Sequence, residues 1–351
     1  MTSNRTAKGS GTVSRREFIG AAAAGVLGGC RSADLAGSDE AGVRFLAFAD
    51  IHYYKPDGFW PHGDREWLDR ILQRAVDERC DFVMSLGDMT FGPKTPEECD
   101  YVRHYNDFKP VRTYHTYGNH EYEDVPAEVT DRVYGLKRPW YSFDLKGFRF
   151  IVLDPHYLYK DGRYLRFDRR CSYPEEKVDR ILPPEQMAWL RKALLDSPYP
   201  CVIFSHESIE RPVGGISNRK DVLALIAEAN RAVPGKVRLA VNGHEHKDFL
   251  RVLDGVVYFD LNSASYDIGA DHTAYPASYV KEHGAMKCCL TWDDPLSAVI
   301  TLTPSGGMSI RGSESRFHLG ITPEMAGWKA DACGRETVAR IQSADFHFHY
   351  S

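Results

Sequence analysis

The sequence lacks any apolar run of the roughly 20 residues that a membrane-spanning helix needs. It also lacks a Gly-x-Ser-x-Gly nucleophile motif and a Walker A phosphate-binding loop, which argues against an α/β-hydrolase-type serine enzyme and a P-loop nucleotidase. The formal net charge is only −5, so the chain as a whole has no strong attraction for nucleic acid or for an anionic membrane.

The eight cysteines include no Cys-x-x-Cys pair. Two of them, Cys80 and Cys201, adjoin apolar strand-like runs, where a buried free thiol is the usual state. We therefore predict that no disulfide framework is essential to the fold.

Apolar residues make up 43% of the 351 positions, which is enough for a substantial core and excludes a disordered chain. Between residues 43 and 303, apolar runs typical of strands alternate with stretches of helical periodicity, which predicts an α/β fold. Residues 304–351 begin rich in Gly and Ser and are interpreted as an accessory C-terminal segment. The clearest predicted elements are strands at 43–49, 82–86, 201–205 and 237–241 and helices at 184–195 and 219–231.

The N-terminus carries an Arg15-Arg16 pair, a bulky Phe18 and a mild apolar run over residues 20–29. This order resembles a twin-arginine (Tat) export signal, which would make the Tat machinery a partner and place the protein in the periplasm or cell envelope. The run that ends at Cys30 also resembles a lipoprotein cleavage site, where an acylated cysteine would attach the chain to a membrane. The alternatives are a basic, unstructured N-terminus and a cysteine placed there by chance. The predicted segments are a signal at 1–30, a tether at 31–42 and a catalytic domain at 43–303.

Side chains of the types that bind metals gather where the predicted strands end. In an α/β sheet, the carboxyl ends of the strands are where active sites form. Five separate strand ends each supply Asp, Asn or His, which is hard to explain as coincidence. These residues are Asp50, His52, Asp88, Asn119, His120, His206, His244 and His246.

The blocks that contain them are Asp50-Ile51-His52, Gly87-Asp88, Gly118-Asn119-His120-Glu121, a strand-end His206 and Gly243-His244-Glu245-His246, in that order. Together they resemble the calcineurin-like metallophosphoesterase family. The resemblance covers about residues 43–303 and implies a four-layer α/β/β/α sandwich with a dinuclear metal site at its mouth. The last block is not the His-Glu-x-x-His motif of zinc proteases.

The resemblance also implies which residues bind the metals. Carboxylate, amide and imidazole groups suit Mn, Fe or Zn ions. One ion would be held by Asp50, His52 and His246, the other by Asn119, His206 and His244, and both by a bridging Asp88.

In the reaction that the resemblance implies, a hydroxide bridging the two ions attacks phosphorus in line. His120 would act as general acid or electrostatic partner and not as a ligand, since its ordinary pKa suits proton delivery. For Glu121 and Glu245 two interpretations stay open: they orient the ligands, or they are simply solvated.

Two loops are candidates for substrate binding. Residues 53–63 are rich in aromatic side chains, and residues 155–170 carry five cations against two carboxylates. Aromatic rings can stack on an organic group, and cations suit a phosphorylated ligand. A solvated basic loop packed by its own aromatic residues is an equal alternative for the second. The candidate substrate contacts are Trp60, His62, Tyr157, Arg163 and Arg166.

The sequence thus predicts an exported hydrolase of small phosphomonoesters or phosphodiesters. The alternatives are a nuclease or phospholipid-directed phosphodiesterase, and a metal-stabilised binding protein without turnover. An intact His120 counts against the last, because a binding protein needs no acid beside its metals. After Gly87-Asp88 the sequence continues Met89-Thr90-Phe91, without the tyrosine that purple acid phosphatases place there as an iron ligand, so a coloured iron–tyrosinate site is not expected.

Overall fold

The computed structural model describes residues 42–54, 64–169 and 180–349. The predicted export signal and the candidate residues Trp60 and His62 lie outside these ranges. Within them, no helix combines the length and apolar character needed to cross a bilayer. The cysteines in these ranges are free thiols.

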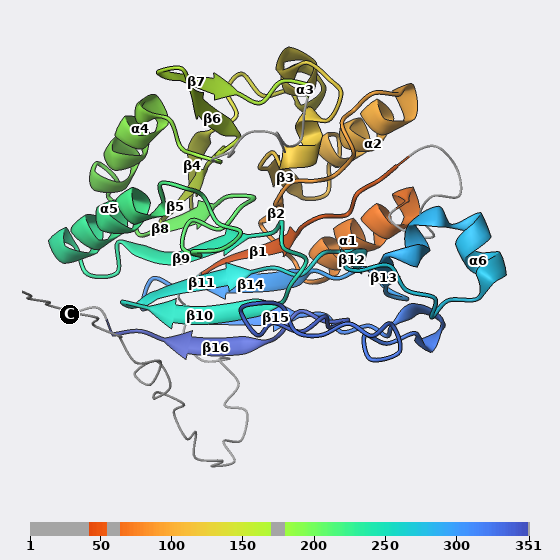
Figure 1. The fold of residues 1–351 in the computed structure, drawn as a ribbon. Helices are drawn as coiled ribbons and strands as arrows, with labels where there is room; N and C mark the ends of the chain where they lie inside the picture. Colours follow the sequence, from red (N-terminus) through yellow and green to blue (C-terminus); the bar gives the residue numbers. More distant parts are fainter. Residues whose placement is uncertain (1–41, 55–63, 170–179, 350–351) are drawn as a thin grey trace, which may run out of the picture. The chain divides into compact units, whose positions relative to one another are not determined.

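The first sheet combines strands from both ends of the described chain (Figure 1). β1, β2 and β3 run parallel, and β14, β15 and β16 extend the sheet in antiparallel fashion beyond β1. The segment 304–351, interpreted from sequence as accessory, therefore supplies two strands of this sheet. In spatial order the strands are β16 (Ala344–His347), β15 (Gly307–Gly312), β14 (Ala298–Leu302), β1 (Val43–Phe48), β2 (Phe82–Ser85) and β3 (Arg112–His115).

The second sheet is parallel in its centre, with one antiparallel strand at each edge. In spatial order its strands are β10 (Phe249–Leu253), β11 (Val256–Asp260), β9 (Val237–Asn242), β8 (Cys201–Phe204), β5 (Phe148–Val152) and β4 (Tyr141–Leu145). Both sheets thus combine parallel and antiparallel strands.

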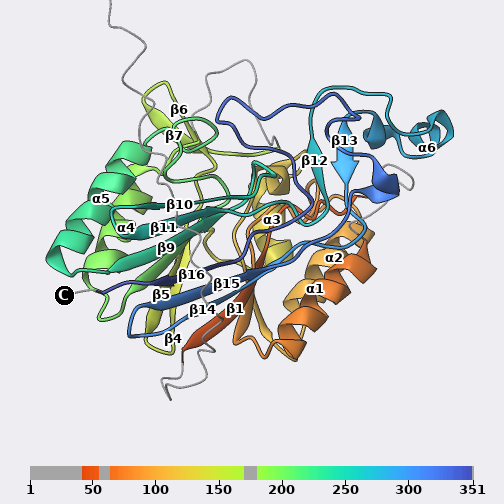
Figure 2. The same cartoon turned by 90° about the horizontal axis from the view of Figure 1, so that it is seen from below.

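Helices cover the outer faces of the two sheets, so the described residues from 42 onward form four layers (Figure 2). α1 and α2 pack on the first sheet, and α5, with α4 beside it, packs on the second. This arrangement confirms the predicted α/β/β/α sandwich. The helices are α1 (Arg65–Asp77), α2 (Pro96–Asn106), α3 (Ala127–Tyr134), α4 (Pro184–Leu195), α5 (Arg219–Ala232) and a short α6 (Ala277–Glu282).

The alternation of side chains along the strands accounts for these layers, because successive residues of a strand face opposite sides of its sheet. Phe150 and Phe204 enter the core between the sheets, where their rings lie 5.7 and 5.6 Å from that of Phe45. Their neighbours Ile151 and Ile203 belong instead to the core under α4 and α5. The same apolar runs therefore fill two cores.

Short elements complete the described structure. They are the 3-10 turns η1 (Asn119–Tyr122), η2 (Gly284–Lys287) and η3 (His318–Gly320), the hairpin β6 (Tyr157–Lys160) and β7 (Arg163–Arg166), and the pair β12 (Tyr266–Ile268) and β13 (Cys289–Thr291).

Candidate metal centre

The backbone is strained where the candidate ligands lie. Five of them have a positive φ, between 50° and 72°, a region that non-glycine residues seldom occupy. Such strain persists only where the surrounding structure fixes the conformation, and it is frequent at functional sites. These residues are Asp50, His52, Asp88, His244 and His246.

The glycines that precede the ligands are required by close approach. A Cβ atom on Gly118 would lie 2.2 Å from Oδ1 of Asp88, and one on Gly243 would lie 2.5 Å from Oδ2 of Asp50. Both distances are far below van der Waals contact, so the Gly of each block allows one strand-end loop to touch the ligand of another.

The first group of candidate ligands comprises Asp50, His52 and His246, which are all buried. Nε2 of His246 lies 3.3 Å from Oδ1 of Asp50, and Nε2 of His52 lies 3.8 Å from the same oxygen. Nδ1 of His246 is 2.8 Å from the carbonyl oxygen of Tyr266, which leaves Nε2 for a metal if Nδ1 carries the proton.

The second group comprises Asp88, His206 and His244. Nε2 of His206 lies 3.1 Å from Oδ2 of Asp88 and 3.3 Å from Nδ1 of His244. The same Asp88 oxygen is 3.6 Å from Nε2 of His52 in the first group. Asp88 therefore lies between the two groups, where a bridging carboxylate belongs.

Several nitrogen and oxygen atoms that could bind a metal are buried in this centre without a hydrogen-bond partner among the described residues. They are both ring nitrogens of His52 and Oδ1 of Asn119. A buried polar atom left in this way costs about 1–3 kcal/mol. Metal coordination would remove that cost, and this mixed set of carboxylate, amide and imidazole donors fits two transition-metal ions.

The electrostatics of the centre favour ionised carboxylates, lower the pKa of two candidate histidines and raise the pKa of the two others, His206 and His246. Burial lowers the pKa of His52 to about 4, and burial with the nearby Arg180 lowers the pKa of His244 to about 3. Burial alone would lower the pKa of His206, but Asp88 and Asp50 raise it to about 10. Although burial opposes ionisation of Asp88, His206 and His120 hold its pKa well below the usual value. A metal would displace the proton of His206.

His120 lies in η1 with its ring at the edge of the centre. Its Nδ1 is 2.5 Å from Oε2 of Glu123, and its backbone N–H donates to Oδ1 of Asp88 at 2.8 Å. The ring contacts those of Phe91 and His52, with centroids 4.9 and 5.1 Å away. The carboxylate of Glu123, which the sequence analysis did not single out, fixes the orientation of this imidazole.

Glu121 and Glu245 are not simply solvated. Glu121 is fully buried and accepts hydrogen bonds from the backbone N–H groups of Asp88, Met89 and Gly118 and from the hydroxyl of Tyr134. Glu121 therefore connects the loop that follows β2 to the loop that follows β3.

Glu245 lies between the ligands His244 and His246 and is held from outside the centre. Arg335 donates to Oε2 of Glu245 at 2.8 Å, and Nη1 of Arg211 lies 3.3 Å from the same oxygen. Arg335 comes from the C-terminal segment, which therefore braces the loop that carries both histidines. No feature of the local sequence pairs these residues, since they are 90 positions apart.

A buried chain of charged groups supports the centre from the side of β5 and β8. Nδ1 of His156 lies 2.5 Å from Oδ1 of Asp154, its Nε2 lies 3.2 Å from Oε1 of Glu207, and Nε of Arg180 lies 2.7 Å from that oxygen. Burial opposes protonation of His156, but Glu207 and Asp154 raise its pKa to about 9. Two signals of this chain of groups are visible in the sequence: a second Asp-x-His, Asp154-Pro155-His156, after a strand, and Glu207 beside His206.

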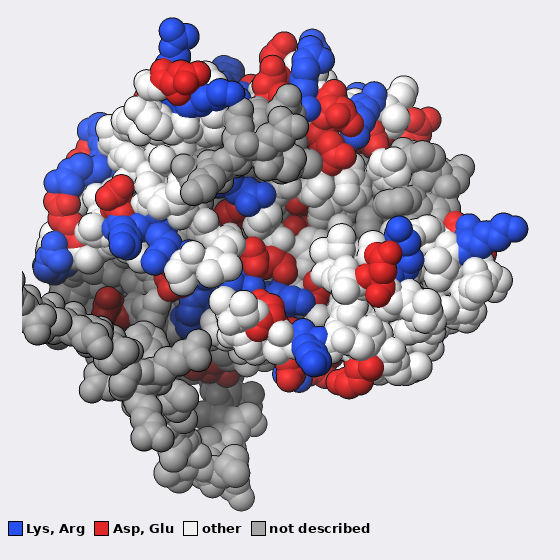
Figure 3. Space-filling view, in the orientation of Figure 1, with Lys and Arg blue, Asp and Glu red and all other residues white. Residues whose placement is uncertain are grey.

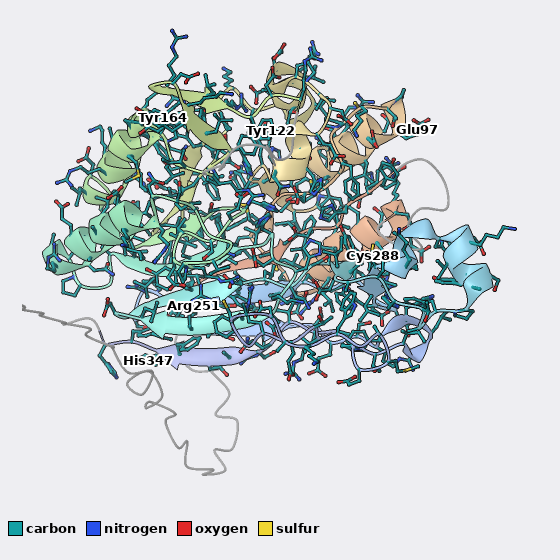
Figure 4. All side chains as sticks on the ribbon, viewed as in Figure 1. Glu97, Tyr122, Tyr164, Arg251, Cys288 and His347 are labelled. Carbon is teal, nitrogen blue, oxygen red and sulfur yellow. The ribbon has the colours of Figure 1, made fainter. Side chains whose placement is uncertain are left out.

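The described candidates for substrate contact lie away from the cavity beside the metal centre. Arg166 forms a two-pronged ion pair with Asp131 and stacks on Tyr122, which is labelled in Figure 4. Arg163 is exposed in β7, and the ring of Tyr157 lies 6.1 Å from that of Trp140. Tyr157, Arg163 and Arg166 are not among the described residues that line the cavity beside the metal centre. Any substrate contact by these residues stays a prediction.

Comparison with solved structures finds similar proteins of low sequence identity, of which the first has a TM-score above 0.5 and shares the fold. A dimetal phosphatase from Danio rerio shares 16% identity, with 88% of this chain and 99% of that chain covered and a TM-score of 0.57. The anchor protein of the inner membrane complex of Plasmodium shares 12% identity over 88% and 89% of the chains, with a TM-score of 0.49. A purple acid phosphatase from yellow lupin seeds shares 16% identity over 81% and 52%, with a TM-score of 0.46.

No curated protein sequence matches the chain at a significant level. Residues 43–248, however, match the family described as calcineurin-like phosphoesterase. That range contains every strand-end loop of the centre, and its Asp and His groups form an apparent two-metal site. The chain therefore belongs to the calcineurin-like phosphoesterase family of metal-dependent enzymes.

Proposed function

We propose that the protein hydrolyses small phosphomonoesters or phosphodiesters with the help of two Mn, Fe or Zn ions. The observation that carries this proposal is the convergence of seven ligand-type side chains on one buried centre. Two of them, Asn119 and His52, contain buried atoms able to bind a metal that have no hydrogen-bond partner within the part of the chain that the structure describes. The proposed ligands are Asp50, His52, Asp88, Asn119, His206, His244 and His246.

Two ions bound by these residues would activate a water molecule and neutralise the charge of the phosphoryl group. The protein itself would supply the proton for the leaving group. When Nδ1 of His120 donates to Glu123, the protonated ring retains an Nε2–H for the oxygen of the departing alcohol. Phe91 packs against the same ring and limits its rotation.

Mixed surface charge favours small molecules over nucleic acid. On the face drawn in Figure 3, the described Lys and Arg side chains are interspersed with Asp and Glu. A protein that binds nucleic acid through many phosphates usually presents a continuous basic surface.

The test is hydrolysis of 4-nitrophenyl phosphate and bis(4-nitrophenyl) phosphate by protein supplied with Mn²⁺, Zn²⁺ or Fe²⁺. We expect turnover of at least one ester, and the preferred ester separates a monoesterase from a diesterase. Two bound ions per chain without turnover of either ester would contradict the proposal and favour a binding protein.

We also propose export by the Tat machinery and membrane attachment through Cys30. The support is the Arg15-Arg16 pair before a short apolar run, with Cys30 at its end. Replacing both arginines by Lys is expected to keep the protein in the cytoplasm of a Tat-competent bacterium, whereas Cys30→Ala should release exported protein from the membrane fraction. Fractionation with unchanged distributions in both variants would refute export and attachment.

A further inference from the structure

A cavity of about 320 Å³ opens directly beside the metal centre. On one side it is lined by ligands and by His120. The remaining wall is built by β12, η2, β13 and the residue that joins η2 to β13, together with Phe91, whose ring contacts that of His120. The lining residues of that wall are Phe91, Tyr266, Ile268, Gly284, Ala285, Lys287, Cys288 and Cys289.

This wall is mostly apolar. Within this wall, 58% of the surface of Ile268 is exposed, whereas Ala285 and Cys289 are buried. Cys288, labelled in Figure 4, lies in the segment that joins η2 to β13. The described lining has one Lys or Arg, Lys287, and its Nζ lies 3.8 Å from the carboxylate of Asp271. Both charges are largely exposed, so water screens them and the wall has little net attraction for an anion.

Aromatic rings connect this wall to the metal centre. The Tyr266 ring lies 5.2 Å from that of His52 and 4.8 Å from that of His246, and the Phe91 ring lies 4.8 Å from that of His52. An ester whose phosphoryl group reached the ligands would place its alcohol portion between these rings and Ile268. Except for Phe91, the wall comes from residues beyond 248, where the family match ends.

From this wall we propose the substrate class: a phosphate ester of an uncharged, apolar alcohol of one or two rings, such as an arylalkyl phosphate. The inference rests on the proposed hydrolase function. Because most of this wall is apolar, a polyol or sugar would lose hydration there and regain few hydrogen bonds, whereas an apolar group gains by leaving water. The cavity is at the small end of ligand sites, which span about 300–1,000 Å³.

The test compares 2-phenylethyl phosphate with 2-hydroxyethyl phosphate, two primary alkyl esters of equal charge. If the nitrophenyl esters reveal a diesterase, their methyl diesters replace them. With metal-loaded protein we expect kcat/KM to be at least about 10-fold higher for the phenylethyl ester, as burial of a ring predicts. Calorimetry should show a similar preference for 2-phenylethylphosphonate over 2-hydroxyethylphosphonate, which provides a readout apart from turnover.

The variant Ile268→Ser removes part of the wall at an exposed position, so the fold should be retained. It is expected to reduce the preference for the phenyl ligands about 3- to 5-fold in both assays. The matched control is Val252→Ser, an exposed β-branched residue of β10 that does not line the cavity; it should leave the preference unchanged.

Equal kcat/KM and equal binding for the two ligand types, in protein that cleaves a nitrophenyl ester, would overturn the substrate class and leave the hydrolase function intact. Loss of preference in Val252→Ser as large as in Ile268→Ser would also overturn it. Failure to cleave any ester would instead count against the proposed function.

Discussion

Asp88→Asn is expected to lower kcat/KM for the preferred nitrophenyl ester by about 1,000-fold or more. Oδ2 of this carboxylate lies 3.1 Å from Nε2 of His206 and 3.6 Å from Nε2 of His52, so a single oxygen contacts a histidine of each group of candidate ligands. Asn keeps the shape but removes the charge that two neighbouring cations share. A loss of this size corresponds to about 4 kcal/mol of transition-state stabilisation.

Metal content decides how that loss is interpreted. After chelation and resupply of metal, elemental analysis should find two ions bound to the native chain and fewer bound to Asp88→Asn. The variant should also retain its remaining ions more weakly. The matched control is Asp107→Asn, a mostly exposed carboxylate beside Lys109, which should keep both activity and metals. Full activity with two bound ions in Asp88→Asn would show that Asp88 does not bridge the two ions.

His120→Ala is expected to slow hydrolysis of an alkyl phosphate by about 100- to 10,000-fold, the usual contribution of a positioned general acid. The effect should be much smaller for a nitrophenyl ester, because nitrophenolate is a weak base and leaves without a proton. This dependence on the leaving group separates proton donation from general electrostatic stabilisation.

The alternative for His120 is a role as ligand, since it lies within metal-binding distance of His52 and Asp88. A ligand would lower the bound metal when removed, whereas an acid would leave two ions in place. Elemental analysis of His120→Ala therefore distinguishes them, with His104→Ala, a histidine of α2 bonded to Asp69, as the matched control. Equal losses for alkyl and nitrophenyl esters would contradict the role as acid.

The sequence alone predicted the elements whose signals are local. The helix expected at 184–195 is α4 with the same bounds, and the helix at 219–231 differs from α5 by one residue. Proline at the start of α4 and regular apolar spacing explain this success, since both act within a few residues. The sandwich was predictable only through the resemblance, because the order of motifs, not their periodicity, indicated it.

In the site too, some features were predictable from the sequence and others were not. The candidate ligands follow strands, and the parallel strands of one sheet bring their carboxyl ends to one edge, so the motifs alone predicted that Asp50 and Asp88 would lie close together. His206 follows β8 of the second sheet, so its contacts with Asp50 and Asp88 depend on how the two sheets pack. Glycine in three of the blocks was visible in sequence, but the reason for it, contact between loops from different strands, was not.

The sequence by itself determined the strand-ending motifs, the helices with clear local signals and, through the resemblance, the family. Only the tertiary structure decided that residues 304–351 add β15 and β16 to the first sheet, that Arg335 holds Glu245, and that β12 and β13 wall the cavity. The physical reason is separation along the chain. Turn and helix signals act between near neighbours, whereas strand pairing and buried ion pairs join residues tens of positions apart, and these are specified by the packing of the whole core.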